Sequence, residues 1–179
     1  PLTPPYPTQL ASCVFEYVYL SHPESIFNGI RIGDARMSMG CRLAVEEKTL
    51  FDPKTTAVAC VPRTALPSAQ AYAQKLGLPY VDLLQPVKSV ARTFLLSNPQ
   101  ERYKLALQKF TVHLTSEYDH IKDWIFVDDS LVRGNTWYAV QELVREANVT
   151  RQIKNKNLDQ EQTEGSSTTL PKYQLRLSC

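Results

Sequence analysis

The fold is decided by the stretch Ile125-Phe126-Val127-Asp128-Asp129-Ser130-Leu131-Val132-Arg133-Gly134-Asn135-Thr136. The apolar run from Trp124 to Val127 leaves no room for helical periodicity and indicates a buried central strand. Two carboxylates, a hydroxyl, an arginine and a glycine follow this run, and an amphipathic helical pattern begins directly after them. Ligands of open α/β sheets bind just beyond the carboxyl ends of such strands. The stretch therefore predicts a ligand site at a strand end.

The side chains of this stretch suit a sugar phosphate. Carboxylates such as those of Asp128 and Asp129 accept hydrogen bonds from vicinal hydroxyls or hold Mg²⁺. Gly134 allows the backbone to approach a ligand closely. A phosphate can be held by backbone N–H groups at the helix start and by the polar side chains Ser130, Asn135 and Thr136. We interpret the stretch as a cradle for a phosphate and a ribose.

Strand and helix patterns alternate at short spacing along the rest of the chain, which predicts parallel βαβ units. The β-branched and aromatic runs predict strands over residues 13–20, 57–61, 80–84 and 124–127. Helices are predicted from Asp34 onward, over 67–76 with Gly77 as the C-cap, and over 101–109. The helix after the decisive stretch has one apolar face, formed by Val140, Leu143, Val144 and Ala147.

The composition limits the classes of protein to which the chain can belong. The chain has 179 residues, 43% of them hydrophobic and 21% charged, which is typical of a single globular domain. A net charge of +2 gives no argument for a nucleic acid or an anionic membrane as a partner. No apolar stretch approaches the roughly 20 residues that span a bilayer. The four cysteines are widely spaced without a C-x-x-C pair, and three of them lie in apolar patterns that fit buried, reduced thiols and a cytoplasmic setting.

Three regions are expected. Residues 1–12 are proline-rich and predict an extended arm, and residues 13–148 carry the folded domain. Residues 149–179 are polar and predict a disordered or divergent tail. Within the domain, residues 85–100 have no clear periodicity, and a loop of that length is typically functional. The chain does not begin with methionine, which suggests a fragment of a longer protein.

The sequence resembles the phosphoribosyltransferase half of glutamine phosphoribosylpyrophosphate (PRPP) amidotransferase, also called amidophosphoribosyltransferase. The matching stretches occur in the family's order and cover roughly residues 13–148: CVFEYVYLSHPESIFNGI (13–30), DARMSMGCRLA (34–44), VPRTALPSAQAYAQKLGLPYV (61–81), VARTF (90–94) and FVDDSLVRGNT (126–136). The resemblance implies a type I phosphoribosyltransferase-like α/β fold, with a mainly parallel sheet and helices on both faces. It also implies the first step of de novo purine synthesis, in which PRPP and ammonia give phosphoribosylamine and pyrophosphate.

The resemblance assigns roles to individual residues. Asp128 and Asp129 contact the ribose hydroxyls and Mg²⁺. Residues 130–136 hold the 5′-phosphate, a set that comprises Ser130, Leu131, Val132, Arg133, Gly134, Asn135 and Thr136. The loop that faces the pyrophosphate is formed by Pro62, Arg63, Thr64 and Ala65. Lys88 and Arg92 fall in the flexible loop that closes over PRPP and serve as candidate catalytic residues. The implied partners are PRPP and ammonia, with a homo-oligomer as a further possibility.

The chain departs from the family in three places. The glutaminase domain that supplies ammonia has no counterpart, and Cys13, within a strand pattern, is expected to be a core thiol. Arg63 stands where the family usually has an acidic residue, and Pro86-Val87 replace a lysine and an asparagine. The match stops near Asn148, so the C-terminal part is expected to be truncated or divergent, without the family's next strand. These departures keep open a non-catalytic PRPP-binding remnant or regulatory module of the same fold.

One other class of protein has an acidic pair at a strand end, the response-regulator receiver domain. Its acidic pair lies near the start of the domain, with a phosphoacceptor aspartate roughly 40–50 residues further on. The only aspartate beyond Asp129 is Asp159, in the polar C-terminal region. The receiver interpretation is therefore rejected. The three histidines are isolated, and Arg36 and Arg42 are expected to be solvated residues on a helix face.

Overall fold

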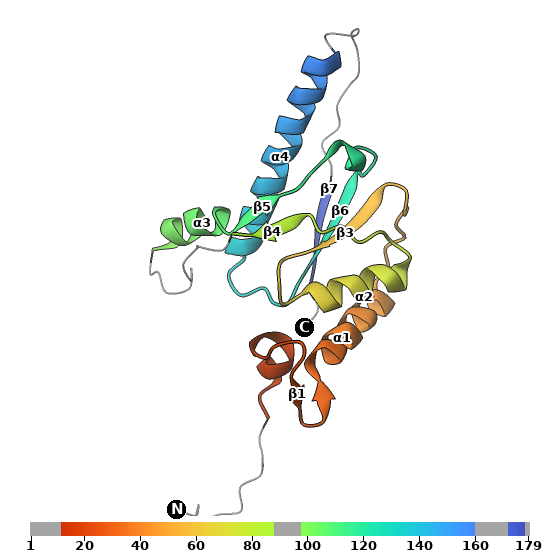
Figure 1. The fold of residues 1–179 in the computed structure, drawn as a ribbon, viewed down its shortest axis with the longest axis vertical. Coiled ribbons are helices and arrows are strands. Elements are labelled where there is room, and N and C mark those ends of the chain that lie inside the picture. Colours follow the sequence, from red (N-terminus) through yellow and green to blue (C-terminus); the bar gives the residue numbers. More distant parts are fainter. Residues whose placement is uncertain (1–11, 88–97, 160–171, 178–179) are drawn as a thin grey trace, which may run out of the picture.

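The computed structural model describes residues 12–87, 98–159 and 172–177, arranged around a three-stranded parallel sheet (Figure 1). Its strands are β3 (Thr56–Cys60), β6 (Asp123–Asp128) and β7 (Lys172–Leu177), with β6 in the centre. The register pairs Thr56 with Asp123 on one side of β6, and Asp123 with Lys172 on the other. The strands predicted over 57–61 and 124–127 are confirmed, and the apolar run of the decisive stretch is the buried middle of the sheet.

Helices cover both faces of the sheet. Helix α2 (Leu66–Leu76) packs on one face, and helix α4 (Asn135–Asp159) packs on the other (Figure 1). Because successive strand residues point to opposite faces, neighbouring residues of β3 and β6 enter different cores. The core beneath α2 contains Val58, Cys60, Ile125 and Val127, and the core beneath α4 contains Ala57, Ala59, Trp124 and Phe126. The predicted mainly parallel sheet with helices on both faces is confirmed.

Helix α1 (Ile32–Glu46) lies against α2 at close range. A Cβ atom added to Gly40 would lie 2.0 Å from the carbonyl oxygen of Ser68, so only glycine fits there. The Ser68 hydroxyl also donates a hydrogen bond of 2.9 Å to the carbonyl oxygen of Arg36. The helices predicted from Asp34 and over 67–76 are confirmed, and Gly77 caps α2 with a φ of 69°.

The strand predicted over residues 13–20 is wrong. The segment forms a π-helical turn, η1 (Glu16–Leu20), in which only Val18 is buried. Its apolar and aromatic side chains have no neighbouring strand to pair with, and Tyr17 packs edge-on against Phe27 at a centroid distance of 5.4 Å. Cys13 is exposed, so the expected core thiol is also wrong; Cys41 is exposed as well, and only Cys60 of the described cysteines is buried.

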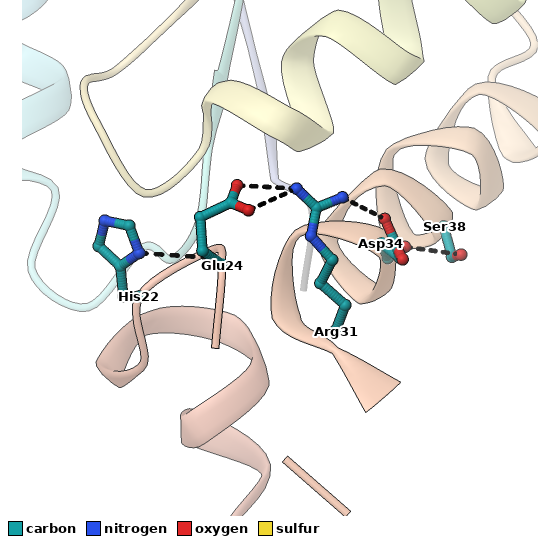
Figure 2. A network of polar contacts seen from close by, with 5 residues as sticks. All are labelled: His22, Glu24, Arg31, Asp34 and Ser38. Atoms are coloured by element: carbon teal, nitrogen blue, oxygen red, sulfur yellow. Dashed lines mark hydrogen bonds and ion pairs between the residues drawn. The ribbon is translucent and has the colours of Figure 1, made fainter. Parts of the chain in front are cut away.

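A short hairpin joins η1 to α1. Strands β1 (Ile26–Phe27) and β2 (Ile30–Arg31) pair in antiparallel fashion around Asn28 and Gly29, whose φ values are 50° and 78°. Figure 2 shows the polar network that fastens this hairpin region to α1. Arg31 pairs with Glu24 at 2.8 Å and with Asp34 at 3.4 Å, and these side chains remain largely exposed to solvent.

A second antiparallel pair of strands follows α2 in the sequence. Strands β4 (Leu84–Pro86) and β5 (Phe110–Val112) pair in antiparallel fashion, with helix α3 (Pro99–Leu107) between them in sequence. Helix α3 confirms the helix predicted over 101–109. The strand predicted over 80–84 is wrong for most of its length, because Tyr80 makes only an isolated parallel bridge with Val58 before the chain turns toward β4. A 3₁₀ turn, η3 (Ser116–Tyr118), precedes β6.

The described part of the C-terminal region is ordered. Helix α4 continues to Asp159, and β7 adds a parallel strand beside β6, so the expected disordered tail without a further strand is wrong for 149–159 and 172–177. Long-range contacts outweigh the polar composition here. Arg151 pairs with Asp119 at 3.1 Å, and Arg176 pairs with Glu47 at 2.5 Å. Residues 1–11 of the predicted arm and the loop residues 88–97 lie outside the described residues.

Among the helices of the described ranges, none combines the length and the apolar character needed to cross a membrane.

Candidate functional site

The candidate site lies at the carboxyl ends of β3 and β6. Parallel pairing sets Cys60 opposite Val127, and the Val61 N–H then donates a hydrogen bond of 2.9 Å to the Val127 carbonyl oxygen. The loop that begins at Pro62 therefore leaves the sheet beside the loop that begins at Asp128. Two of the sequence segments predicted to bind the substrate are brought together by this geometry.

The two aspartates are both buried, with exposed fractions of 9% for Asp128 and 8% for Asp129. The Asp129 N–H donates to Asp128 Oδ1 at 2.9 Å, and the Ser130 hydroxyl donates to Asp129 Oδ1 at 3.0 Å. A strand end with two solvated carboxylates would show neither feature. The backbone turn thus holds both carboxylates within the protein while it presents them at the edge of the sheet.

Burial sets the electrostatics of the pair. It is the main cause that raises the pKa of Asp128 to about 7; the neighbouring Asp129 charge raises it further, while the Asp129 N–H and Lys109 oppose the rise. Burial also raises the pKa of Asp129, against hydrogen bonds from Ser130 and Thr64 and the charge of Arg36. Burial therefore makes it costly to charge both carboxyl groups, and a bound cation or hydroxyl donors would relieve that cost.

Arg36 is the cation that the sequence did not assign to the site. Its exposed fraction is 2%, so the expectation of a solvated helix-face residue is wrong. Its Nε donates to the Tyr17 carbonyl oxygen and its Nη2 to the Ser21 carbonyl oxygen, both at 2.8 Å. Burial lowers its pKa, and Asp129 counteracts that effect. A spacing signal was present in the sequence, since the buried residues Ile32, Arg36, Gly40 and Ala44 recur every four positions along α1.

Lys109 is the second cation near the pair. It follows α3 and precedes β5, is partly buried, and accepts a backbone hydrogen bond of 2.8 Å from the Val87 N–H. Burial lowers the pKa of its amine, and the charge of Asp128 opposes this. No sequence motif predicted a role for Lys109, because its place near Asp128 results from the antiparallel pairing of β4 with β5.

The predicted phosphate loop leads from the aspartates into α4. Gly134 has a φ of 72°, and its carbonyl oxygen accepts a hydrogen bond of 2.9 Å from the Tyr138 N–H. Three of the predicted ligands are half-buried, namely Ser130, Asn135 and Thr136, whereas Leu131, Val132 and Arg133 are exposed. The first N–H groups of a helix have no partner within the helix, so they are suited to an anion. The role of the loop as a phosphate binder stays a prediction.

The predicted pyrophosphate loop divides into inner and outer residues. The Thr64 side chain acts to lower the pKa of Asp129, and Ala65 is buried in the core beneath α2. Pro62 is half-buried, Arg63 is exposed, and the peptide bond between them is cis. Lys88 and Arg92, the candidate catalytic residues, lie outside the described residues. Thr64 is therefore the residue of this loop that influences the acidic pair.

The donor set at the strand end fits Mg²⁺. Within the described part of the chain, no group of three or more metal-ligating side chains gathers at one place. Mg²⁺ is commonly bound through one or two carboxylates, with substrate phosphates and water as the other ligands. Asp128 and Asp129 supply such a pair, and their crowded negative charge is the setting that a divalent cation relieves.

The fold and the site together define a class. A parallel sheet covered by helices on both faces, with an acidic pair at the central strand end and a loop that opens the next helix, is the type I phosphoribosyltransferase fold. No family model matches the chain.

Sequence comparison with known proteins shows which family of this class the chain resembles. The chain is 39% identical to human amidophosphoribosyltransferase over 138 residues, which is 77% of this chain and 26% of that protein. It is 34% identical to amidophosphoribosyltransferase of Archaeoglobus fulgidus over 137 residues, which is 76% of this chain and 29% of that protein. The chain thus spans about a quarter of the length of the curated relatives that it matches.

Solved structures give the same result. The glutamine PRPP amidotransferase of B. subtilis, complexed with ADP and GMP, aligns with a TM-score of 0.57 at 30% identity, over 75% of this chain and 28% of that one. A structure described as the allosteric regulatory enzyme of purine biosynthesis aligns with a TM-score of 0.60 at 26% identity, over 93% of this chain and 30% of that one. The chain is similar, in sequence and in fold, to the phosphoribosyltransferase part of amidophosphoribosyltransferase.

Proposed function

We propose that the chain binds PRPP and transfers its phosphoribosyl group to ammonia in purine nucleotide synthesis. The observation that carries the proposal is the pair of buried carboxylates at the end of β6, where Ser130 donates a hydrogen bond to Asp129 beside the loop that opens α4. The similarity to amidophosphoribosyltransferases supports the choice of substrate. A cytoplasmic location is proposed with it, supported by the free thiols of Cys13, Cys41 and Cys60.

The proposed reaction exchanges one bond at C1 of the ribose. The ammonia nitrogen forms a bond to C1, the bond from C1 to the pyrophosphate oxygen breaks, and pyrophosphate leaves with the electron pair. The nitrogen then loses a proton to give phosphoribosylamine. Because positive charge develops on the ribose during this displacement, positioning and electrostatics matter more than a protein nucleophile. The ammonia is proposed to come from solution or from a glutaminase domain, and a homo-oligomer stays a prediction.

Different residues of the chain are proposed to bind different parts of PRPP. Asp128 and Asp129 accept hydrogen bonds from the ribose hydroxyls, and they are the residues that would hold Mg²⁺. Bound Mg²⁺ would supply charge neutralisation for the pyrophosphate group. The loop over 130–136 holds the 5′-phosphate through backbone N–H groups at the start of α4. Pro62, Arg63, Thr64 and Ala65 face the pyrophosphate, where the exposed Arg63 offers a cation that can pair with it.

The test measures PRPP binding and turnover separately. Isothermal titration with PRPP and Mg²⁺ gives the affinity, and pyrophosphate release with ammonium gives the rate. The double substitution Asp128→Asn/Asp129→Asn is expected to weaken binding by about a hundredfold or more, since hydrogen bonds to charged groups are among the strongest in proteins. Asp123→Asn, at the opposite end of the same strand, is the matched control and is expected to leave the affinity unchanged.

The possible outcomes separate the two candidate functions. Binding together with pyrophosphate release supports the transferase. Binding of PRPP without release by the unmodified chain would reject the transferase and favour the non-catalytic PRPP-binding module. No binding at all would reject the cradle itself.

A further inference from the structure

The C-terminal strand β7 is an edge of the described sheet, where β6 is its strand neighbour (Figure 1). The parallel register runs from Asp123 opposite Lys172 to Asp128 opposite Leu177. On the other side of β6, the register with β3 ends at Val127. Within the part of the chain that the structure describes, β7 is therefore the strand that pairs alongside the first carboxylate residue of the candidate site.

The sequence of β7 does not fix this register by itself. Polar and apolar residues alternate over Lys172–Leu177, so the alternation determines which residues share a face of the sheet. A slip of one residue would exchange the two faces, but a slip of two residues would leave each residue type on its own face. A contact outside the strand ladder is what can distinguish registers that differ by two residues.

The Arg176 side chain makes such a contact. Its Nε donates to Glu47 Oε2 at 2.5 Å, and its Nη2 donates to Gln174 Oε1 at 2.7 Å. Glu47 follows α1 directly, and two further donors hold it in place. The Tyr72 hydroxyl of α2 donates to its Oε2, and the Thr49 N–H donates to its Oε1, both at 2.9 Å. The Glu47 side chain is 8% exposed, so Arg176 meets a buried acceptor whose position is set by other elements.

A slip of β7 would break this contact. Two residues of a strand span roughly 6.6 Å, which would carry Arg176 away from the Glu47 carboxylate. The slip would leave a buried carboxylate and a partly buried guanidinium without their partners, and that is strongly unfavourable. Specification of register is also the best-attested role of buried polar groups. The ion pair therefore disfavours the registers that the alternation of residues permits.

We propose that Glu47 and Arg176 are positioning residues, which hold β7 in the one register that supports Asp128 for PRPP binding. The inference rests on the proposed function and extends it to two residues outside the predicted site. From the β3 side, the Val61 N–H braces the same strand end by a hydrogen bond of 2.9 Å to the Val127 carbonyl oxygen. The acidic pair thus follows a strand end that is held on both sides, and the ion pair sets the register of one side.

The decisive variant removes the ion pair without leaving a buried group unpaired. The triple substitution Glu47→Met/Tyr72→Phe/Arg176→Met replaces both charges and the hydroxyl by apolar groups of similar size. Replacement of a buried ion pair in this way is often neutral or stabilising. The urea midpoint of the triple variant is therefore expected to equal or exceed that of the unmodified chain, so that loss of folded protein does not account for a change in affinity.

Isothermal titration with PRPP and Mg²⁺ measures the positioning effect. The triple variant is expected to bind PRPP about tenfold more weakly, because small displacements of binding groups are costly. The control Arg42→Met/Glu46→Met removes the exposed ion pair of α1 and is expected to leave the affinity unchanged. Unchanged affinity in the folded triple variant would show that the buried pair serves stability alone, and would overturn the proposal.

Nuclear magnetic resonance of the ligand-free proteins observes the register directly and separates this inference from the proposed function. The unmodified chain is expected to show a nuclear Overhauser contact between backbone protons of Asp128 and Leu177. The triple variant is expected to show contacts of Asp128 with Leu175 as well, two residues out of register. A single, unchanged register in the triple variant would overturn the inference. If the unmodified chain bound no PRPP, the proposed function would fail, and these contacts would still decide whether the ion pair sets the register.

An exchanged ion pair keeps the proposal testable if the triple variant does not fold. Glu47→Arg/Arg176→Glu restores opposite charges at the two positions, whereas Arg176→Glu alone places two carboxylates together. The exchanged pair is expected to recover the contact between Asp128 and Leu177 that the single substitution loses. Equal loss of that contact in both variants would overturn the proposal.

Discussion

Two arginines at the start of helix α1 are held in different ways, and their difference shows which charges matter in this molecule. Arg31, directly before the first residue of α1, forms ion pairs with Glu24 and Asp34, and all three side chains are exposed to solvent (Figure 2). Within the helix, Arg36 is buried, and it donates hydrogen bonds to the carbonyl oxygens of Tyr17 and Ser21. The two arginines lie close together in the sequence, yet only the second is removed from water. Exposed pairs contribute little because water screens them, whereas a buried charge depends on its partner.

The end of α1 repeats the contrast with two adjacent glutamates. Glu46 is 59% exposed at its side chain and pairs with Arg42, four residues earlier in the same helix. Glu47 is 8% exposed and pairs with Arg176 of β7, while it accepts a hydrogen bond of 2.9 Å from the Tyr72 hydroxyl. Glu47 thus ties the C-terminal strand to α1 and α2. Burial, rather than the number of ion pairs, decides which contacts hold the fold together.

The largest effect is expected at Gly40, because it allows the buried face of α1 to approach α2. In Gly40→Ala, the new Cβ would lie 2.0 Å from the Ser68 carbonyl oxygen, so the helices would have to separate. The higher helix propensity of alanine recovers only about 1 kcal/mol. We expect a net loss of about 4 kcal/mol in the free energy of unfolding, measured in urea. Ser38→Ala, on the exposed face of α1, is the control; equal stability of the two variants would contradict the close packing.

The next largest loss of stability is expected at Glu47, and it tests whether the buried glutamate contributes more than the exposed Glu46. Glu47→Gln leaves the Arg176 guanidinium partly buried without its charged partner. We expect a loss of about 2 kcal/mol in the free energy of unfolding at pH 7. Glu46→Gln is the matched control and is expected to cost less than about 0.5 kcal/mol. Similar losses for both variants would show that exposure does not decide the strength of these pairs.

The same glutamate predicts a pH dependence. Burial alone would raise the pKa of Glu47, but hydrogen bonds from Arg176, Thr49 and Tyr72 hold it at about 2, below its usual 4.5. The folded state therefore keeps this carboxylate charged where the unfolded state binds a proton. Its stabilising contribution is complete above about pH 4.5 and is lost as the pH falls toward 2. Urea unfolding between pH 5 and 2.5 is expected to show a shrinking difference between the unmodified chain and Glu47→Gln; a constant difference would contradict the assignment.

The sequence predicted those parts of the molecule that depend on neighbours along the chain. The strand before Asp128, the acidic pair and the glycine that opens α4 all lie within one short stretch, so local pattern was sufficient. Strand β7 and helix α4 beyond Asn148 were missed because their polar residues are held by distant partners, such as Arg176 by Glu47 and Arg151 by Asp119.

The residues of the candidate site also fall into those that local sequence predicted and those that it did not. Asp128 and Asp129 follow the central strand and could be predicted from their position. Arg36 and Lys109 come from segments remote in sequence, and only tertiary packing brings them to the pair. The π-helical turn over 16–20 was mistaken for a strand because β-branched and aromatic residues fit either structure when most of them stay exposed.

The smallest effect is expected at Arg31, and it sharpens the comparison with Arg36. Arg31→Met removes both ion pairs of the network in Figure 2, in which the Arg31 and Glu24 side chains are 47% and 67% exposed. Because these charges are solvated and screened, the melting temperature is expected to stay within measurement error of the unmodified chain, both at low salt and at 0.5 M NaCl. PRPP affinity is expected to stay unchanged as well, since Arg31 lies outside the set of groups that act on Asp129. A clear fall in the melting temperature of Arg31→Met would show that exposed ion pairs, and not only buried contacts, stabilise this part of the molecule.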